Sequence, residues 1–362
     1  MNGDVELTAN ILIYNQSLPG TSIMQEIRFR TEIPLPRYGF NIEHHHKILT
    51  MGSCFATNLA DRLRRFRFDV SDNPFGVLYN PVSVSNAMDI IQSERQFAKE
   101  DLTFHDEQWH SFYHHSDFSH PDADHCLATI NEGLRKARQF LTSADILIVT
   151  YGTAYVYRYI KTGQIVSNCH KIPAGQFEHY RLSFEEIRDS IRKTVETAHK
   201  LNPKLRIVFS VSPIRYLKEG FIQNQLSKAV LLLAVNDVSD KNDRCIYFPA
   251  YEILMDDLRD YRFYEANLTH PNAIAVDYIW QVFSRSFFSK SCFGIMEKVK
   301  KVVQAYEHRP RNPQTGKHKQ FILKQLNFAE QLQKEYPHLK LRKETDYFRE
   351  LLSTIEKDHF NL

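Results

Sequence analysis

The chain has 362 residues, of which 43% are hydrophobic, and 46 Lys and Arg stand against 43 Asp and Glu. This length predicts one large α/β domain with an appendage, or two domains, and the apolar content suffices for a substantial core. A formal net charge of +3 does not indicate a dedicated nucleic-acid surface. Because no apolar run approaches membrane-spanning length and no signal-peptide pattern opens the chain, we expect a cytoplasmic protein without membrane contact.

The five cysteines are odd in number and widely spaced, which indicates reduced thiols rather than a disulfide framework or structural zinc. No dinucleotide fingerprint and no phosphate-loop motif is present, so we predict no cofactor. Residues 1–27 show no periodicity and are expected to form a loosely ordered leader. An α/β domain is expected over 28–296, and the basic, helical composition of 297–362 predicts an appendage or partner surface.

The chain is organised around a short apolar run that follows Lys47 and stops at Gly52, and apolar residues at helical spacing come after it. Ser53 and Cys54 therefore stand at a turn from a strand into a helix. Unpaired N–H groups and the helix dipole favour negative charge at such a position, which suits a reactive thiolate or an oxyanion. The competing interpretation is an inert buried cysteine beside a serine that caps the helix.

A turn-rich passage over 72–81 follows the second predicted strand and carries Gly76 and Asn80. In a doubly wound sheet, loops that leave the carboxyl ends of strands gather at one edge and build the site. Gly76 is therefore a candidate backbone donor beside the thiol, or simply a turn glycine with positive φ. The next helix is predicted over 83–97, with Ser83 or Ser85 as its cap.

Residues 102–126 are rich in Trp, His, Ser and Asp and predict a long loop. We interpret it as a polar and aromatic lid over a sugar-like or acyl substrate, with Trp109 and His115 as candidate binding residues. A metal site and a plain surface flap are the alternatives, although no two ligand types fall at a firm metal spacing. The His44–His46 run ahead of the first strand is interpreted as a solvated loop rather than a metal site.

Further strand ends carry polar groups. A continuous apolar strand over 146–149 ends near Gly152, and the passage 165–173 brings together Asn168 and His170, which either hold a substrate or oxyanion or brace a loop. Helices are predicted over 126–141, 184–201 and 221–234, and strands over 204–213 and 245–249. In the helix over 221–234 we expect an inward face, with Asn224, Gln225 and Lys228 pointing elsewhere; the inward residues are Leu226, Ala229, Val230 and Leu233.

His270 stands on the loop before a late helix, with Pro271 in that helix's first turn. Strands that alternate with helices at this spacing predict a parallel sheet covered on both faces. His270 then lies at the same sheet edge as Ser53 and Cys54, where it is a candidate general base; a loop or capping histidine is the alternative.

The order of these pieces resembles the SGNH (GDSL-like) hydrolases, and the pentapeptide Gly52-Ser-Cys-Phe-Ala56 is similar to the signature of the bacterial GSCFA family. The resemblance covers roughly residues 28–290 and implies a doubly wound, flavodoxin-like three-layer α/β fold and ester chemistry. The helical appendage expected from the composition lies C-terminal to this part. The resemblance places the nucleophile third in its motif, at Cys54, with Ser53 as the alternative.

At the remaining motif positions, this sequence matches the SGNH pattern in some places and departs from it in others. Gly76 matches the block glycine, but Gly152-Thr153-Ala154 lacks the amide of the hydrolase pattern, so Asn168 or Asn80 would replace it in the oxyanion hole. Asn267 stands where that pattern has an Asp to orient the histidine, and Glu265 is an alternative. A Cys–His pair tolerates Asn as its third member better than a Ser–His pair does.

Three hypotheses follow. The first is an acyl-transfer enzyme, an esterase in preference to an O-acyltransferase, that acts on a carbohydrate or similar acylated metabolite. The second is a ligand-binding module of the same fold that has lost the chemistry, suggested by Ala154 and Asn267. The third is a metal-dependent hydrolase that uses the histidines between 110 and 125. The sequence predicts no oligomeric state.

Overall fold

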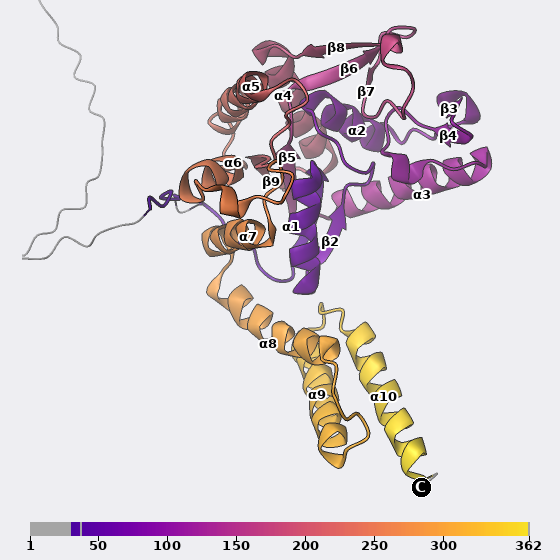
Figure 1. Cartoon of the computed structure of the whole chain (residues 1–362), viewed down its shortest axis with the longest axis vertical. Helices are drawn as coiled ribbons and strands as arrows, with labels where there is room; N and C mark the ends of the chain where they lie inside the picture. The colour runs from indigo at the N-terminus through magenta and orange to yellow at the C-terminus, as the bar shows by residue number, and fades with distance from the viewer. Residues whose placement is uncertain (1–29, 37, 361–362) are drawn as a thin grey trace, which may run out of the picture. The chain divides into compact units, whose positions relative to one another are not determined.

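The computed structural model describes residues 30–36 and 38–360, nearly all of which belong to one compact unit, Glu32–Leu362 (Figure 1). The leader expected over residues 1–27 lies outside the described residues. In the described part of the chain, no helix is long and apolar enough to cross a membrane.

The centre of this unit is a five-stranded sheet in which every neighbouring pair is parallel. Its strands are β1 (Lys47–Gly52), β2 (Asp69–Asp72), β5 (Ile146–Tyr151), β9 (Arg206–Val211) and β10 (Cys245–Phe248), in the order β10-β9-β5-β1-β2. Numbered within this sheet alone, the order is 2-1-3-4-5, the doubly wound order of flavodoxin-like folds. The predicted fold class is confirmed, and its topological switch point lies between β1 and β5.

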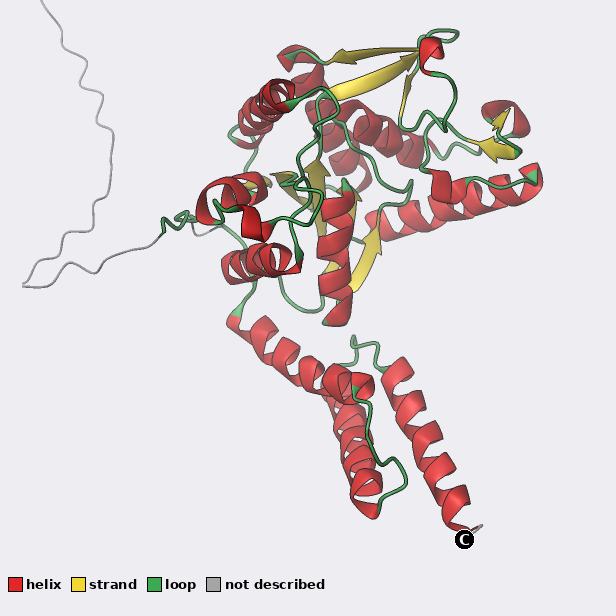
Figure 2. Cartoon of the chain, viewed as in Figure 1, coloured by secondary structure: helices red, strands yellow, loops and turns green. Residues whose placement is uncertain are grey.

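Helices cover both faces of this sheet, as the colouring by secondary structure shows (Figure 2). One face packs against α1 (Cys54–Arg65) and α7 (Ala273–Phe287). The other packs against α2 (Pro81–Ser93), α3 (Ala123–Leu141), α4 (Phe184–Leu201) and α5 (Phe221–Ser239). Because both faces are covered, β5 is buried at every position, which explains its unbroken Ile-Leu-Ile-Val run.

Two small antiparallel sheets accompany the central sheet. One joins β6 (Tyr155–Tyr159), β7 (Ile165–Val166) and β8 (Phe177–Arg181), with the short helix η3 (Ala174–Gln176) before β8. The other pairs β3 (Thr103–His105) with β4 (Gln108–His110), flanked by η1 (Lys99–Asp101) and η2 (Ser116–Phe118). The region predicted as one long loop is therefore a hairpin with short turns. Its backbone groups pair locally, and Trp109 and His120 exchange two hydrogen bonds.

Helix boundaries shift where the caps differ from the predicted ones. Asn80 caps α2 through a 2.9 Å bond from Ser83 N to Asn80 Oδ1, so the helix starts before the predicted Ser83. Asn272 caps α7, which leaves Pro271 outside the first turn where we expected it. The remaining short elements are α6 (Ala250–Glu252), the π-helical turn η4 (Ile253–Asp257) and η5 (Tyr261–Phe263).

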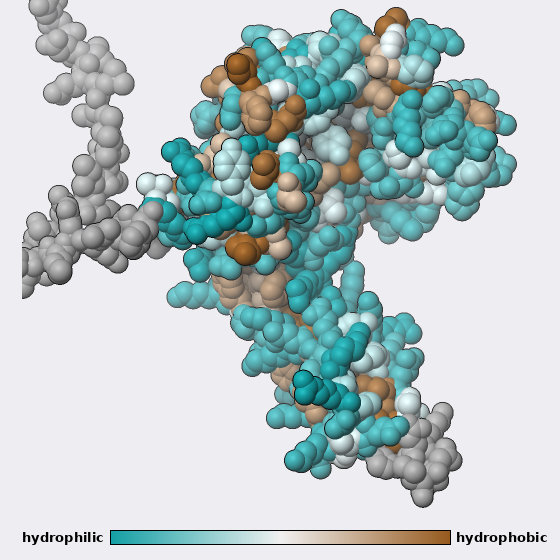
Figure 3. Space-filling model, in the orientation of Figure 1, coloured by the Kyte–Doolittle hydropathy of each residue, from teal (hydrophilic) through white to brown (hydrophobic). Residues whose placement is uncertain are grey.

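The predicted inward face of α5 is wrong. Leu226 and Leu233 are 44% and 64% exposed, whereas Asn224 and Lys228 are 4% and 1% exposed. Apolar patches are visible over α5 in the space-filling view (Figure 3). The polar side chains face inward because backbone groups at the ends of the sheet strands need partners there: Tyr216 N donates to Asn224 Oδ1, and Lys228 Nζ donates to two carbonyls.

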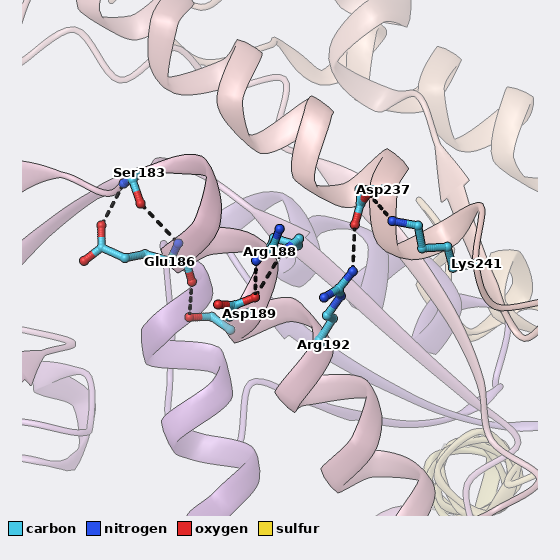
Figure 4. A network of polar contacts seen from close by, with 8 residues as sticks. Ser183, Glu186, Arg188, Asp189, Arg192, Asp237 and Lys241 are labelled. Carbon is cyan, nitrogen blue, oxygen red and sulfur yellow. Dashed lines mark hydrogen bonds and ion pairs between the residues drawn. The ribbon is translucent and has the colours of Figure 1, made fainter.

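A polar network orders α4 and joins it to α5 (Figure 4). Ser183 caps α4 with a reciprocal capping box, in which Glu186 N donates to Ser183 Oγ and Ser183 N donates to Glu186 Oε2. Further along, Arg192 reaches Asp237 of α5 at 3.2 Å, and Lys241 pairs with the same carboxylate. These cations hold the pKa of Asp237 below its usual range.

The C-terminal helices α8 (Lys290–Glu307), α9 (Gly316–Glu335) and α10 (Arg342–Phe360) form their own apolar core. They contact the α/β part beside the end of α1, where Arg67 pairs with the fully buried Glu344. His44, expected in a solvated loop, is buried there: its Nε2 donates to Phe66 O at 2.8 Å, and its Nδ1 lies 3.2 Å from His338 Nε2.

Candidate functional site

The turn after β1 is fixed by close backbone approach. Gly52 has φ +126°, and a Cβ there would lie 2.1 Å from Thr150 O, so only glycine fits. Ser53 N donates to Thr150 O at 2.9 Å, which joins the end of β1 to that of β5. The turn therefore stands at the topological switch point, where doubly wound proteins bind their ligands.

The two candidate nucleophiles have different surroundings. Ser53 is 1% exposed, and its Oγ accepts from Phe55 N at 3.3 Å as the cap of α1. Cys54 is the first residue of α1 and is half-buried, with Sγ 3.5 Å from Tyr79 Oη. The N–H of a first helical residue has no acceptor within its helix, so the Cys54 amide can serve an oxyanion.

Tyr79 is held against this turn by its own backbone. Tyr79 O accepts from Gly152 N at 2.8 Å and from Thr153 N at 3.0 Å, which ties the loop after β2 to the end of β5. Burial, followed by contact with the Cys54 thiol, raises the pKa of Tyr79, so its hydroxyl stays protonated at neutral pH. A protonated Tyr79 can donate to a Cys54 thiolate.

The two candidate donors on this loop differ. Gly76 has φ +72°, its N–H donates to Asn73 O at 2.7 Å, and an added Cβ would lie 2.2 Å from His115 Cβ. These are the features of a turn glycine, and they leave its N–H engaged. The Oδ1 of Asn80 is used as the cap of α2, which leaves its NH₂ group for the cavity that the residue lines. Asn80 is thus better placed than Gly76 to donate.

A cavity of about 470 Å³ lies beside Tyr79. Its walls come from the loops after β2 and β5, the β6-β7-β8 sheet and the loop after β9. Aromatic rings dominate the lining, with amides, hydroxyls and one lysine between them; the principal residues are Tyr79, Asn80, His115, Tyr155, Tyr157, Asn168, Phe177, Tyr216 and Lys218. The lysine amine already donates to Tyr157 Oη. An aromatic wall with few charges suits an uncharged, polyhydroxylated or acyl-bearing ligand.

Three candidate binding residues make their described contacts with other parts of the fold. Asn168 lines the cavity, but its Nδ2 donates to Ser116 Oγ at 3.1 Å and its Oδ1 accepts from His170 N at 2.9 Å. His170 is 4% exposed, lies 2.9 Å from Ser111 O through Nε2, and burial lowers its pKa to about 4. Trp109 belongs to β4, its ring lies tilted 5.1 Å from that of Phe104, and it does not line the cavity. The first two brace the loop, the alternative that the sequence left open.

His270 lies in the loop that leads into α7. Its Nδ1 is 2.9 Å from Thr269 Oγ1 and 3.0 Å from Asn267 Nδ2, and Thr269 Oγ1 donates to Asn267 Oδ1 at 2.9 Å. Asn267 Nδ2 donates to Nδ1 when Nδ1 is unprotonated, so that contact belongs to the tautomer with the proton on Nε2. With the proton on Nδ1 instead, the ring donates to Thr269 Oγ1, whose hydroxyl donates to Asn267 Oδ1. Nε2 is then an acceptor, as a general base requires. Among the described residues, Glu265 bonds to His270 only through the backbone, from Glu265 N to His270 O.

The base loop is attached to the strand edge through the loop after β9, where Arg215 N donates to Thr269 O at 3.0 Å. No hydrogen bond joins Cys54 and His270 in this structure, although both belong to the edge formed by the carboxyl ends of the strands. Catalytic bonds of this kind are often long without substrate and shorten when it binds.

Sequence reasoning missed Tyr79, Thr269 and Lys228. Tyr79 and Thr269 are direct neighbours of the predicted Asn80 and His270, so the aromatic ring in a turn and the Asn-x-Thr-His order were the available signals. Lys228 gave no signal, because a lysine on a helix usually faces solvent. In the described residues, no group of three or more His, Cys, Asp and Glu is arranged to hold a metal ion.

A parallel sheet in 2-1-3-4-5 order with a thiol at its switch point defines an α/β protein of the doubly wound class. The chain belongs to the GSCFA family, whose model matches residues 47–283; residues 299–354 match the C-terminal domain of GSCFA domain proteins. The resemblance seen in the pentapeptide is thereby confirmed.

Among solved structures, the chain is similar to an acetyl xylan esterase from the rumen bacterium Butyrivibrio proteoclasticus. The identity is 11% and the TM-score 0.32, and the match covers 69% of this chain and 64% of the esterase, less than two thirds of its length. Comparison with curated proteins gives no match.

Proposed function

We propose that the chain is an acyl-transfer enzyme, an ester hydrolase in preference to an O-acyltransferase, that acts on a carbohydrate or similar acylated metabolite. The observation that carries the proposal is the separation of roles at the turn after β1. The Ser53 hydroxyl is engaged as the cap of α1. The Cys54 thiol lies at the start of α1 in contact with Tyr79, which lines the aromatic cavity. Cys54 is therefore the proposed nucleophile and Ser53 a structural residue.

In the proposed reaction, Cys54 Sγ attacks the acyl carbon while His270 Nε2 takes the thiol proton. The tetrahedral oxyanion accepts bonds from Cys54 N–H and from the NH₂ group of Asn80. When the intermediate collapses, His270 returns the proton to the departing alcohol and a thioester remains on Cys54. Water, or the hydroxyl of an acceptor, then attacks the thioester with His270 again as the base, and the thiol is restored.

The tautomer that the reaction requires has the proton on His270 Nδ1, donated to Thr269 Oγ1, whose hydroxyl in turn donates to Asn267 Oδ1. Neither side chain carries a negative charge, so this arrangement orients the ring without the charge stabilisation that a carboxylate gives. A thiol needs less help than a hydroxyl because it ionises more readily, which fits a Cys–His pair with neutral orienting groups.

The cavity supports the proposed substrate class. The rings of Tyr155, Tyr157 and Phe177 line it, and the C–H faces of a sugar ring pack well on such surfaces while amides and hydroxyls meet its polar edges. The lining contains no carboxylate, which argues against a cationic substrate.

Acylation by p-nitrophenyl acetate, followed by intact-mass and peptide mapping, tests the proposal. We expect an acetyl group on Cys54 in the native protein, none at this site in Cys54→Ala, and a retained adduct in Ser53→Ala. His270→Ala should slow acylation by roughly 10²–10⁴-fold, the usual contribution of a general base, and Thr269→Val by less. An adduct on Ser53 would reverse the roles of the two residues, and no adduct on either would favour the ligand-binding module.

A further inference from the structure

Lys228 is the single lysine of α5, and 1% of its surface is accessible. Its Nζ donates to Gly152 O and to Ser212 O, both at 2.7 Å, and lies 5.5 Å from the centre of the Tyr251 ring. No ion pair involving Lys228 occurs among the described residues. A buried amine without a carboxylate is costly for the folded state, and an apolar side chain would fill the space at lower cost.

The first carbonyl belongs to the strand end beneath the nucleophile. Gly152 follows β5, and a Cβ on it would lie 3.5 Å from Ser53 Cβ and 3.3 Å from the Tyr79 ring. Gly152 N donates to Tyr79 O, and Tyr79 Oη contacts Cys54 Sγ. A displacement of Gly152 would therefore reach Cys54 through one packed contact and one hydrogen bond.

The second carbonyl belongs to the strand end that carries the base loop. Ser212 follows β9, and its Oγ accepts from Ile214 N at 3.3 Å. The next residue, Arg215, donates its N–H to Thr269 O, next to His270. The Lys228 amine thus bridges two neighbouring strand ends, one leading to Cys54 and the other to His270.

We propose that Lys228 is a positioning residue whose amine, bonded to Gly152 O and Ser212 O, holds the Cys54 turn and the His270 loop in register. The role rests on the proposed function, because it requires that Cys54 and His270 act as a pair. Lys228 touches neither substrate nor reacting atoms and acts only through the two carbonyls. A single side chain that satisfies both carbonyls keeps two separate loops from relaxing independently.

A double-mutant cycle on Cys54 reactivity tests this role without an assumed substrate. The rate of Cys54 carbamidomethylation by iodoacetamide at pH 7 is followed by peptide mass spectrometry in the native chain, Lys228→Met, His270→Ala and the double variant. We expect Lys228→Met to slow the reaction about tenfold when His270 is present and to have little effect in its absence, because coupled residues give non-additive changes.

Asn202→Ala is the matched control. Asn202 is also buried and its Nδ2 donates to two backbone carbonyls, Leu141 O and Ala144 O, at the opposite end of the sheet. This variant removes a comparable pair of buried hydrogen bonds away from the site and should leave the Cys54 rate unchanged. If Lys228→Met does not fold, Lys228→Gln serves the same cycle; its side chain is one atom shorter and cannot reach both carbonyls, so the same loss of coupling is expected.

The outcomes separate the two proposals. An equal slowing by Lys228→Met with and without His270 shows a merely structural lysine and overturns the inference, as does no slowing while His270→Ala has its effect. If His270→Ala itself leaves Cys54 reactivity unchanged, the catalytic pair fails, and the role of Lys228 fails with it.

Discussion

At the scale of the residue, surroundings decide chemistry that residue type leaves open. Ser53 and Cys54 are adjacent, yet one hydroxyl is consumed by Phe55 N and the neighbouring thiol faces Tyr79. His170 and His270 are both histidines but have different surroundings. His170 is buried, and burial lowers its pKa to about 4. His270 lies in the loop before α7, beside the neutral side chains of Asn267 and Thr269. A general base needs an accessible nitrogen, so of these two histidines His270 is the one that suits the proposed role.

Lys228 gives the protein a stability term that depends on pH. Burial lowers the pKa of Lys228 to about 7 from the ordinary value of 10.5. Between these values the unfolded chain binds the proton more than the folded one does, so stability contributed at this site rises with pH and is lowest below pH 7. Relative to Lys228→Met, which lacks the term, the native chain should gain up to about 2 kcal/mol in free energy of unfolding from pH 7 to 9.

Urea unfolding of both proteins at the two pH values measures this gain. The two chains differ only at residue 228, so the titration of all other groups cancels in the difference between their free energies of unfolding. A difference that stays constant from pH 7 to 9 would contradict the burial-driven shift.

At the scale of the element, caps and packing decide where helices begin and which face they bury. The predicted start of α4 is confirmed, and the structure shows the local reason for it, a capping box formed by Ser183 and Glu186. The inward face of α5 was not predicted correctly, because its apolar residues are spread around the helix and form no clear stripe. Its register was decided by Asn224 and Lys228, which meet backbone groups of the strand ends.

Removal of the α4 cap should cost stability. Ser183→Ala deletes the acceptor for Glu186 N and loosens the return bond from Ser183 N, so we expect a loss of about 1 kcal/mol in the free energy of unfolding. Ser190→Ala is the control on the same helix, because its Oγ only donates back to Glu186 O at 2.7 Å. That change should cost less than about 0.5 kcal/mol, since alanine is the better helix former. Equal losses in chemical denaturation would show that the capping box does not matter.

At the scale of the whole molecule, ion pairs join the C-terminal helices to the α/β part, and these pairs differ in how far their side chains are buried. Glu344 of α10 is fully buried and pairs with Arg67, just after α1, while Arg65 pairs with Glu307 where both side chains are largely exposed. Buried and exposed ion pairs differ in what their loss leaves behind, because an unpaired buried carboxylate cannot be solvated.

Arg67→Met should therefore lower the free energy of unfolding by about 3 kcal/mol or more, because it strands the Glu344 carboxylate. Arg65→Met, which breaks the exposed pair, should cost less than about 1 kcal/mol. Urea unfolding compares the two, and limited proteolysis should show earlier cleavage after residue 297 in the first variant only. Similar losses in both would mean that Glu344 is not held by Arg67 alone.

The sequence by itself determined the local elements and the family. Apolar runs that end at glycine mark β1 and β5, and the alternation of strands and helices predicts a doubly wound sheet, because these signals lie within a few neighbouring residues. The Gly52–Ala56 pentapeptide and the His270 loop marked the proposed nucleophile and base for the same reason.

Only the tertiary structure decided how distant segments share contacts. In the structure Ser53 caps α1, and the Cys54 thiol contacts Tyr79. Asn168 and His170 bond to each other within their loop, and Lys228 is buried where it bonds to backbone carbonyls at two strand ends. Each of these outcomes depends on which backbone groups from other segments lack partners at that place. Local spacing carries no information about such groups, and the need to pair them inside the fold overrides the preference of a lysine for water.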